Sequence, residues 1–316
     1  MSTMGEWAIQ TIGLCKNFGN FAALKELNLE IPPNSVYGFL GPNGSGKTTT
    51  IRLLTGLSNP TSGRALIMGY DSSNRSLSAR RLIGYLPDVP SFHKYMTGME
   101  YLVFCGELSG FTFNEAKAQA SKQLERTNLH DAAGRKTSTY SRGMKQRLGL
   151  AAAMVGDPKV LFLDEPVSAL DPIGRAEVLA IVRQLKEIKT IFLSTHILTD
   201  VERICDKVGI IDHGRMIVSD TVNNLKNRYA QNRFLLRFAQ DPADILQQIK
   251  AQPWCEHAVV NRNNEGQIIM IVKAKNMAAA QQNLPLLAAQ KGNTLIRYEI
   301  VEPSLEEIFI DLAGVN

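Results

Sequence analysis

Residues Gly41 to Thr49 form the stretch of the chain best suited to binding phosphate. This stretch follows the apolar run Val36 to Leu40 and precedes the helix-compatible run Ile51 to Leu57. Its glycines let the backbone curl so that successive N–H groups point at a phosphate chain, and the positive end of the next helix adds attraction. The pattern predicts a phosphate-binding loop for a nucleoside triphosphate. The alternative, a glycine-rich turn with a chance lysine, leaves the strand-loop-helix context unexplained.

Every residue of this loop is a candidate contact to the triphosphate. We expect Lys47 to reach the β- and γ-phosphates, and the Thr48 hydroxyl to be a ligand of Mg²⁺. The full set is Gly41, Pro42, Asn43, Gly44, Ser45, Gly46, Lys47, Thr48 and Thr49.

Two adjacent carboxylates follow a second apolar run. Asp164 and Glu165 come directly after Lys159 to Leu163. Two acids at the end of a buried strand suit two tasks, with Asp164 holding Mg²⁺ and Glu165 polarising the water that attacks the γ-phosphorus. The alternative is a strand that ends in a solvated acidic turn, which is common where no phosphate loop is present.

A third motif begins at Tyr140 and lies just before the helical run Leu148 to Val155. It contains Ser141 and Gly143. Here the chain resembles the ATP-binding cassette (ABC) family, whose signature is most often Leu-Ser-Gly-Gly-Gln. Ser141 and Gly143 match that signature, whereas the other positions resemble ATPase subunits of ABC-2 type exporters, the drug-resistance and sodium-efflux-like group. A short Ser-x-Gly before a helix would also serve as an ordinary helix start.

The resemblance assigns further residues. The loop Ser168 to Pro172, which contains Asp171, resembles the segment that passes between two subunits in this family. His196 matches the switch histidine that contacts the γ-phosphate, although a lone histidine after a strand is more often structural. Phe18, about two dozen residues before the loop, could stack on the purine base or could equally be a core residue.

One position departs from the family pattern. Most members carry a glutamine near the start of the helical region that touches Mg²⁺ and the attacking water, and Asp88 takes that place here. An ionised carboxylate cannot donate a hydrogen bond but binds metal more strongly. Asp88 is therefore either a metal ligand that alters coupling or a simple loop residue.

The predicted fold is an α/β P-loop cassette. The alternation of strands and helices predicts a mostly parallel sheet. We also expect an antiparallel β subdomain and a helical insert at about 97–156, in which Asn114 is a helix cap. Residues 1–228 are expected to form the nucleotide-binding domain and 229–316 a small α+β accessory domain. The motif Glu302 to Phe309 resembles the C-terminal extension of the same exporter subunits.

Composition narrows the function classes. The chain has 316 residues, of which 44% are hydrophobic and 21% charged, with a formal charge of +5. Basic and acidic residues are interspersed, which argues against a nucleic-acid surface. No run approaches the ~18 apolar residues needed to cross a bilayer, no signal-peptide pattern begins the chain, and four scattered cysteines suggest no zinc site or disulfide framework. A cytosolic location, at the inner face of the membrane, is expected.

The resemblance implies an ATPase that binds ATP and Mg²⁺, forms a dimer with a second ABC subunit, most simply a homodimer, and energises export through a separate polytopic permease. The permease would dock near Pro87 to Tyr101. The alternative is a non-transport ABC ATPase acting on DNA or the ribosome, but such relatives usually carry a long coiled coil, zinc-binding cysteines or two cassettes. A small-molecule kinase would leave Ser141, Glu165 and His196 without a joint explanation.

Overall fold

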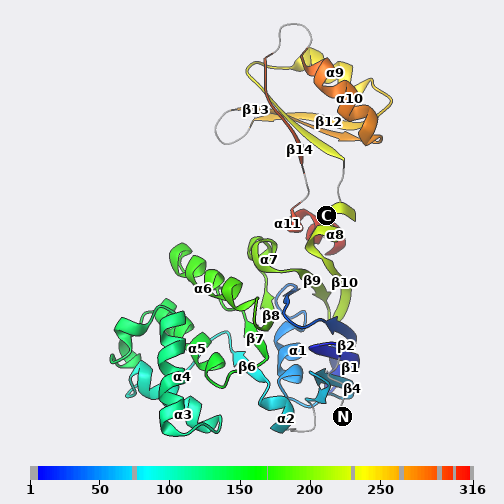
Figure 1. Ribbon diagram of the computed structural model, residues 1–316. Helices are drawn as coiled ribbons and strands as arrows, with labels where there is room; N and C mark the ends of the chain where they lie inside the picture. The colour runs from blue at the N-terminus through cyan, green and yellow to red at the C-terminus, as the bar shows by residue number, and fades with distance from the viewer. Residues whose placement is uncertain are drawn as a thin grey trace. The chain divides into compact units, whose positions relative to one another are not determined.

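The computed structural model describes residues 6–72, 77–168, 170–228, 232–262, 267–289, 294–301 and 304–313. The chain divides into two compact units, Met1–Val222 and Asn223–Asn316. The boundary expected from the sequence, after residue 228, falls at the end of helix α8 (Val222–Arg228), and residues 229–231 lie outside the described part. Figure 1 labels the helices and strands of both units, which are described separately below.

The centre of the first unit is a six-stranded sheet in the order β10-β9-β3-β8-β7-β6. All neighbouring strands run parallel except β10, which is antiparallel to β9. Strands β3, β7 and β8 are buried along their whole length, as expected for parallel strands covered on both faces. The strands are β3 (Val36–Leu40), β6 (Ile83–Leu86), β7 (Val160–Asp164), β8 (Thr190–Thr195), β9 (Lys207–Asp212) and β10 (Arg215–Thr221).

A four-stranded antiparallel sheet, in the order β2-β1-β4-β5, makes up the predicted β subdomain. Its strands are β1 (Ile9–Phe18), β2 (Phe21–Ile31), β4 (Ser62–Ile67) and β5 (Tyr70–Asp71). The first two are long and meet at a two-residue turn, where Gly19 has a φ of 57°. This long hairpin carries Phe18 to its tip.

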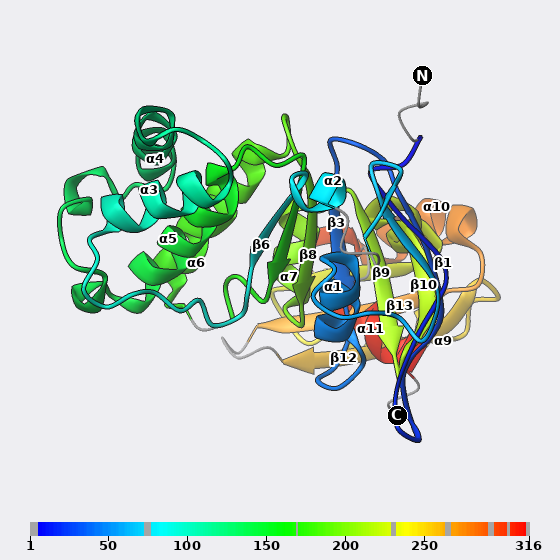
Figure 2. The same ribbon diagram turned by 90° about the horizontal axis from the view of Figure 1, so that it is seen from below.

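Helices cover the parallel sheet and build a separate cluster. Helix α1 (Lys47–Leu54) packs on one face of the parallel sheet. Helices α6 (Pro172–Leu185) and α7 (Leu198–Ile204) contribute to the core on its other face, and the short α2 (Leu77–Arg80) contacts β5. Figure 2 shows α3 (Gly98–Leu108), α4 (Phe113–Arg126) and α5 (Arg142–Val155) grouped on the side of β6. These three helices and the 3₁₀ turns η1 (His130–Ala132) and η2 (Thr137–Thr139) occupy the predicted helical insert and share a core that includes Leu102, Ala120 and Leu148.

The prediction of Asn114 as a helix cap is wrong. Helix α4 begins one residue earlier, and Thr112 is its N-cap. The Thr112 side chain accepts a hydrogen bond from the Glu115 backbone, while Glu115 Oε2 accepts one from the Thr112 N–H at 2.8 Å. This reciprocal capping box satisfies two backbone donors, and Asn114 does not take part.

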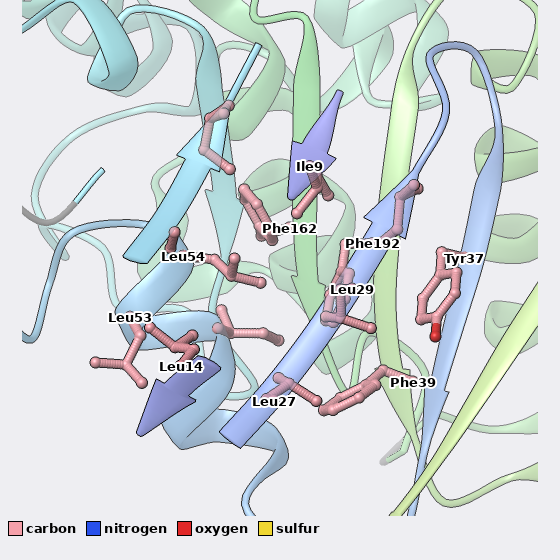
Figure 3. Packing of buried hydrophobic residues seen from close by; sticks show 14 of the residues in the cluster. Ile9, Leu14, Leu27, Leu29, Tyr37, Phe39, Leu53, Leu54, Phe162 and Phe192 are labelled. Carbon is pink, nitrogen blue, oxygen red and sulfur yellow. The ribbon is translucent and has the colours of Figure 1, made fainter. Parts of the chain in front are cut away.

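The main core of the first unit lies between the antiparallel sheet, α1 and one face of the parallel sheet (Figure 3). Phe39, Phe162 and Phe192 come from three neighbouring parallel strands. The centre of the Phe192 ring lies 5.1 Å from that of Phe39 and 5.7 Å from that of Phe162. Leu14, Leu27 and Leu29 come from β1 and β2 and close this core from the other side. Burying these side chains fixes β3 and α1, the elements on either side of the phosphate loop.

The second unit contains a four-stranded sheet in the order β12-β13-β11-β14, with all pairs antiparallel. Its strands are β11 (Arg233–Phe238), β12 (Cys255–Arg262), β13 (Ile268–Ala274) and β14 (Leu295–Val301), and its helices besides α8 are α9 (Ala243–Lys250), α10 (Met277–Ala288) and α11 (Leu305–Ala313). Phe234 and Leu236 pack with Ile245, Ile249 and Leu284 in one core.

Two sequence expectations in this unit need comment. Strand β12 went unpredicted because polar residues interrupt its apolar alternation, and only Cys255 and Ala258 are buried. Of the tail motif, Leu305 to Phe309 begin α11 and Ser304 directly precedes it, whereas Glu302 and Pro303 lie outside the described residues.

All four cysteines of the chain, Cys15, Cys105, Cys205 and Cys255, are free thiols.

Candidate functional site

The phosphate loop joins β3 to α1 and depends on its glycines. Gly44 and Gly46 have φ values of 82° and 113°, in the region that favours glycine. A Cβ on Gly41 would lie 2.3 Å from the Ile211 carbonyl oxygen, so no other residue fits there. Gly46 is also the N-cap of α1, whose first N–H groups therefore face the loop.

Lys47 lies inside this loop and is only 6% exposed. Its Nζ donates to the carbonyl oxygens of Gly41 at 2.7 Å and Pro42 at 3.2 Å. The same nitrogen lies 3.6 Å from Glu165 Oε1. A buried ammonium between the phosphate loop and an acid provides the positive charge that a triphosphate requires.

Asp164 ends β7 as a buried carboxylate, 2% exposed. Its Oδ1 accepts a hydrogen bond from Ser194 Oγ at 2.5 Å and lies 3.4 Å from Thr48 Oγ1. The side chain of Glu165 is 13% exposed. The alternative of a solvated acidic turn is therefore wrong.

Glu165 adopts an uncommon backbone conformation, with a φ of 47°. Its N–H donates to Ser194, with the carbonyl oxygen at 3.0 Å and Oγ at 3.2 Å. Its Oε2 lies 2.9 Å from His196 Nδ1. The chain thus turns sharply after β7 and holds the Glu165 carboxylate between Lys47 and His196.

Ser194 is a residue that sequence reasoning did not single out. It is fully buried at the end of β8, and its hydroxyl touches both Asp164 and the Glu165 backbone. No local signal in the sequence marked it: Ser194 lies opposite Asp164 because β7 and β8 are neighbouring parallel strands, and the tertiary structure sets that order.

A cavity of about 360 Å³ opens in front of the loop. It is lined by Phe18, Phe21, Ala23, Asn43, Gly44, Gly46, Lys47, Thr48, Thr49, Asp88 and Glu165. Phe18 is 55% exposed, which excludes the core-residue interpretation, and Lys16 Nζ lies 5.0 Å from the centre of its ring. Phe21, on the other strand of the hairpin, is a lining residue that the sequence did not indicate. Ser45, by contrast, is buried beneath the loop with its Oγ unpaired.

Asp88 reaches the edge of this cavity. Ser168 Oγ lies 3.3 Å from Asp88 Oδ1 and 3.2 Å from the Glu165 carbonyl oxygen, so it bridges the two segments. Burial raises the pKa of the nearby Tyr85 hydroxyl, and the negative charges of Asp164 and Asp88 raise it further against the opposing charge of Arg52. Asp88 therefore contributes to the negative potential at this end of the sheet.

Comparison with known proteins places this geometry in a family. The family model described as ABC transporter matches residues 24–168, and that described as ATP-binding protein DrrA1-3-like, C-terminal domain, matches residues 221–313. The uncharacterized ABC transporter ATP-binding protein YxlF of Bacillus subtilis is 38% identical over 94% of this chain and 96% of its own length. The chain belongs to the ABC transporter ATP-binding proteins.

Two further relatives match this ABC ATPase over nearly its whole length. The daunorubicin/doxorubicin resistance ATP-binding protein DrrA of Streptomyces peucetius is 34% identical over 99% of this chain and 94% of its own. The bacitracin transport ATP-binding protein BcrA of Bacillus licheniformis is 34% identical over 97% of each. A solved ATP-binding subunit of an ABC transporter matches with a TM-score of 0.64 and 26% identity, over 70% of this chain and 93% of that one. The predicted resemblance, fold class and ATPase activity are confirmed, in preference to the DNA, ribosome and kinase alternatives.

Among the predicted site residues of the ABC ATPase that do not line its cavity, three lie at the starts of α5 and α6. Ser141 is the N-cap of α5 and accepts a hydrogen bond from the Met144 N–H at 3.2 Å. Gly143 lies in the first turn of that helix, where a Cβ would meet nothing within 4 Å. Asp171 is the N-cap residue of α6. The open backbone around Gly143 leaves the positive end of α5 accessible to a ligand.

Within the described part of the chain, no helix has the length and apolar composition that would let it span a bilayer.

Proposed function

We propose that this ABC ATPase hydrolyses ATP in the presence of Mg²⁺ to drive export through a separate transmembrane protein. The observation that carries the proposal is the contact between two distant parts of the sequence: Lys47 Nζ lies 3.6 Å from Glu165 Oε1, and Thr48 Oγ1 lies 3.4 Å from Asp164 Oδ1. In open α/β sheets, ligands bind outside the carboxyl ends of the strands, where this cluster lies.

The oxygen donors present fit Mg²⁺. The Thr48 hydroxyl and the Asp164 carboxylate lie 3.4 Å apart, and both are hard ligands. Among the described residues there is no group of three or more His, Cys, Asp or Glu side chains that could hold a metal alone. Mg²⁺ is typically held by one or two carboxylates together with substrate phosphates, so Thr48 and Asp164 would supply the protein's share. Asp88 is a further candidate ligand.

The residues of the chain divide the work of hydrolysis. Glu165 would accept the proton of the attacking water, and His196, at 2.9 Å, would orient that carboxylate and reach the γ-phosphate. Lys47 and the loop N–H groups would neutralise charge on the phosphates, and Mg²⁺, when bound, supplies further charge neutralisation. Phe18, exposed at the tip of its hairpin, would stack on the adenine ring.

A dimer would complete the site. Ser141, Gly143 and Asp171 lie outside their own cavity, so we assign them to the nucleotide bound by a second cassette, most simply another copy of this chain. The N-terminus of α5 would then add donors to the γ-phosphate from the opposite side. Two ATP molecules would lie at the interface.

The transmembrane partner would dock beside the helical cluster. Val89 and Tyr95 are 74% and 89% exposed in the segment between β6 and α3. Exposed apolar side chains of this size are typical of an interaction surface. Docking there would keep the ABC ATPase at the cytoplasmic face of the membrane as a peripheral subunit, and no nucleic acid is expected to bind.

Two relatives carry names that refer to daunorubicin/doxorubicin resistance and to bacitracin transport. By that likeness, an antibiotic-like small molecule or peptide is the cargo class that we would test first. The residues of the site described above face nucleotide and leave the choice of cargo to the transmembrane partner.

The test is to isolate the ABC ATPase from gently solubilised native membranes and to identify the proteins that accompany it. We expect a polytopic membrane protein in near-equal amount, and ATP hydrolysis by the complex that requires Mg²⁺. The variant Val89→Asp should lose the partner while retaining ATP binding, whereas Glu125→Gln, at an exposed position of α4, should retain both. Recovery of ribosomes or nucleic acid in place of a membrane protein would contradict the proposed transport.

A further inference from the structure

The C-terminal sheet has an open edge at β14. Among the described strands, β14 pairs only with β11. An edge strand presents unpaired N–H and C=O groups, and natural proteins often protect such edges with lysine, proline or short length. Strand β14 is seven residues long and has neither lysine nor proline. Ile296 and Ile300 on it remain 50% and 43% exposed. The edge is therefore available for pairing with another strand.

The sequence of β14 is complementary to itself about Tyr298. When two copies are placed antiparallel with Tyr298 opposite Tyr298, Arg297 of each faces Glu299 of the other. The register shift of β14 against β11 falls at Ile296, outside these three residues. Opposite charges on facing residues stabilise a strand pair, whereas like charges destabilise it. We propose that β14 pairs with β14 of a second copy of this chain, so that the two C-terminal sheets join across a twofold axis.

The charges of β14 favour this arrangement over a random encounter. Within one copy, Arg297 and Glu299 already form an ion pair along the strand, and their side chains are 58% and 40% exposed. Two copies would place four charges of alternating sign at the centre of the contact. A twofold axis requires this kind of self-complementarity, because each surface must fit itself.

The opposite edge of the sheet, β12, is less suited to the same role. Its exposed residues are polar, namely Glu256, His257, Asn261 and Arg262. Glu256 is also held by Lys273 of the adjacent strand, with 2.8 Å between Oε1 and Nζ. Glu256 is a carboxylate on the opposite edge of the same sheet, so Glu256→Arg is a matched control for Glu299→Arg.

The contact goes beyond the proposed function because it requires no nucleotide. A cassette dimer closes around ATP, whereas the β14 contact would hold two copies together before and after hydrolysis. Tethering of this kind raises the effective concentration of one cassette for the other without adding a contact at the ATP site. A single strand pair between exposed residues is expected to be weak and sensitive to salt.

The experiment is sedimentation velocity of the full chain without nucleotide, over a series of protein concentrations. We expect a reversible dimer. The variants Arg297→Glu and Glu299→Arg should each weaken dimerisation about tenfold or more, because each places like charges opposite one another twice. An equimolar mixture of the two variants should form heterodimers at least as well as the parent chain, because the acidic strand of one faces the basic strand of the other.

The mixture separates this contact from the internal ion pair, which is lost in both variants, and heterodimer formation shows that both are folded. A parent chain that stays monomeric at every concentration would overturn the proposal, as would single variants that dimerise like the parent. Loss of the dimer in Glu256→Arg, with retention in Arg297→Glu, would assign the contact to β12 instead. None of these outcomes depends on ATP, so a failure of the ATPase assignment would be recognised separately.

Discussion

The two units of the chain use buried polar groups in opposite ways. Among the described residues, the buried polar and charged side chains, such as Lys47, Asp164 and Ser194, lie in the first unit. Those three have hydrogen-bond partners and meet at one edge of the sheet. In the second unit the core is apolar, and Trp254 Nε1 and Tyr298 OH are buried without partners. The candidate site lies in the unit where buried polar side chains gather.

The difference follows from strand direction. In the first unit, parallel strands β7 and β8 bring Asp164 and Ser194 to the same end of the sheet, next to the loop after β3. In the second unit all strand pairs are antiparallel, so the carboxyl ends of neighbouring strands lie at opposite ends of the sheet. An antiparallel sheet of four strands therefore packs helices on one face without gathering polar residues at one edge.

The largest effect is expected from the variant that tests whether one carboxylate of the first unit, Glu165, is the base for ATP hydrolysis. Glu165→Gln should lower the rate of ATP hydrolysis about 10²- to 10⁴-fold, because the amide cannot accept the proton of water. ATP binding should remain, since Lys47 and the loop are unchanged, and an ATP-bound dimer should accumulate. Phosphate release and size-exclusion chromatography with ATP measure both. Parent-like hydrolysis would show that another group is the base.

The next largest effect is expected from removing the Ser194 hydroxyl, which holds Asp164 and Glu165. Ser194→Ala removes the donor 2.5 Å from Asp164 and should lower the catalytic rate about ten- to a hundredfold, with a higher Mg²⁺ requirement and little change in ATP affinity. The matched control is Ser219→Ala, which removes a 2.7 Å hydrogen bond to Tyr37 away from the site. Equal losses of activity in both variants would point to a general loss of stability.

A matched pair of core variants asks whether the two units are separable. Leu236→Ala in β11 should destabilise the second unit by about 2–5 kcal/mol, since the side chain is fully buried. Hydrolysis at low temperature should be unchanged. Leu193→Ala in β8, also buried, should lower both stability and hydrolysis. Calorimetry and phosphate release measure the pair, and a shared loss of activity would show that the units unfold together.

The smallest effect concerns the cap of α4. Thr112→Ala should lower stability by about 1 kcal/mol, whereas Asn114→Ala should have almost no effect. Hydrogen bonds from the Thr112 side chain and then its backbone lower the pKa of Glu115. A carboxyl group whose pKa is lower in the folded state stabilises the fold at pH values above its unfolded pKa. This stabilisation is lost as the pH falls through the folded pKa. The difference between the parent and Thr112→Ala, measured by urea unfolding, should therefore shrink in acid.

Local sequence determined the elements and the type of site. Strand β3 spans the predicted residues, and the described strands and helices around Lys47, Asp164 and His196 lie close to where apolar runs and glycines placed them. These signals are local, because a phosphate loop needs its glycines within a few residues and a buried strand shows a continuous apolar run.

Only the tertiary structure decided which side chains meet. The pairing of Ser194 with Asp164, the bridge from Ser168 to Asp88 and the exclusion of Ser141 from its own cavity all depend on strand order, which local patterns do not encode. Strand β12 escaped prediction for a similar reason, because pairing with β13 stabilises it despite its polar residues. The cap at Thr112 differs, since Thr112 and Glu115 form a capping-box pattern that is already present in the local sequence.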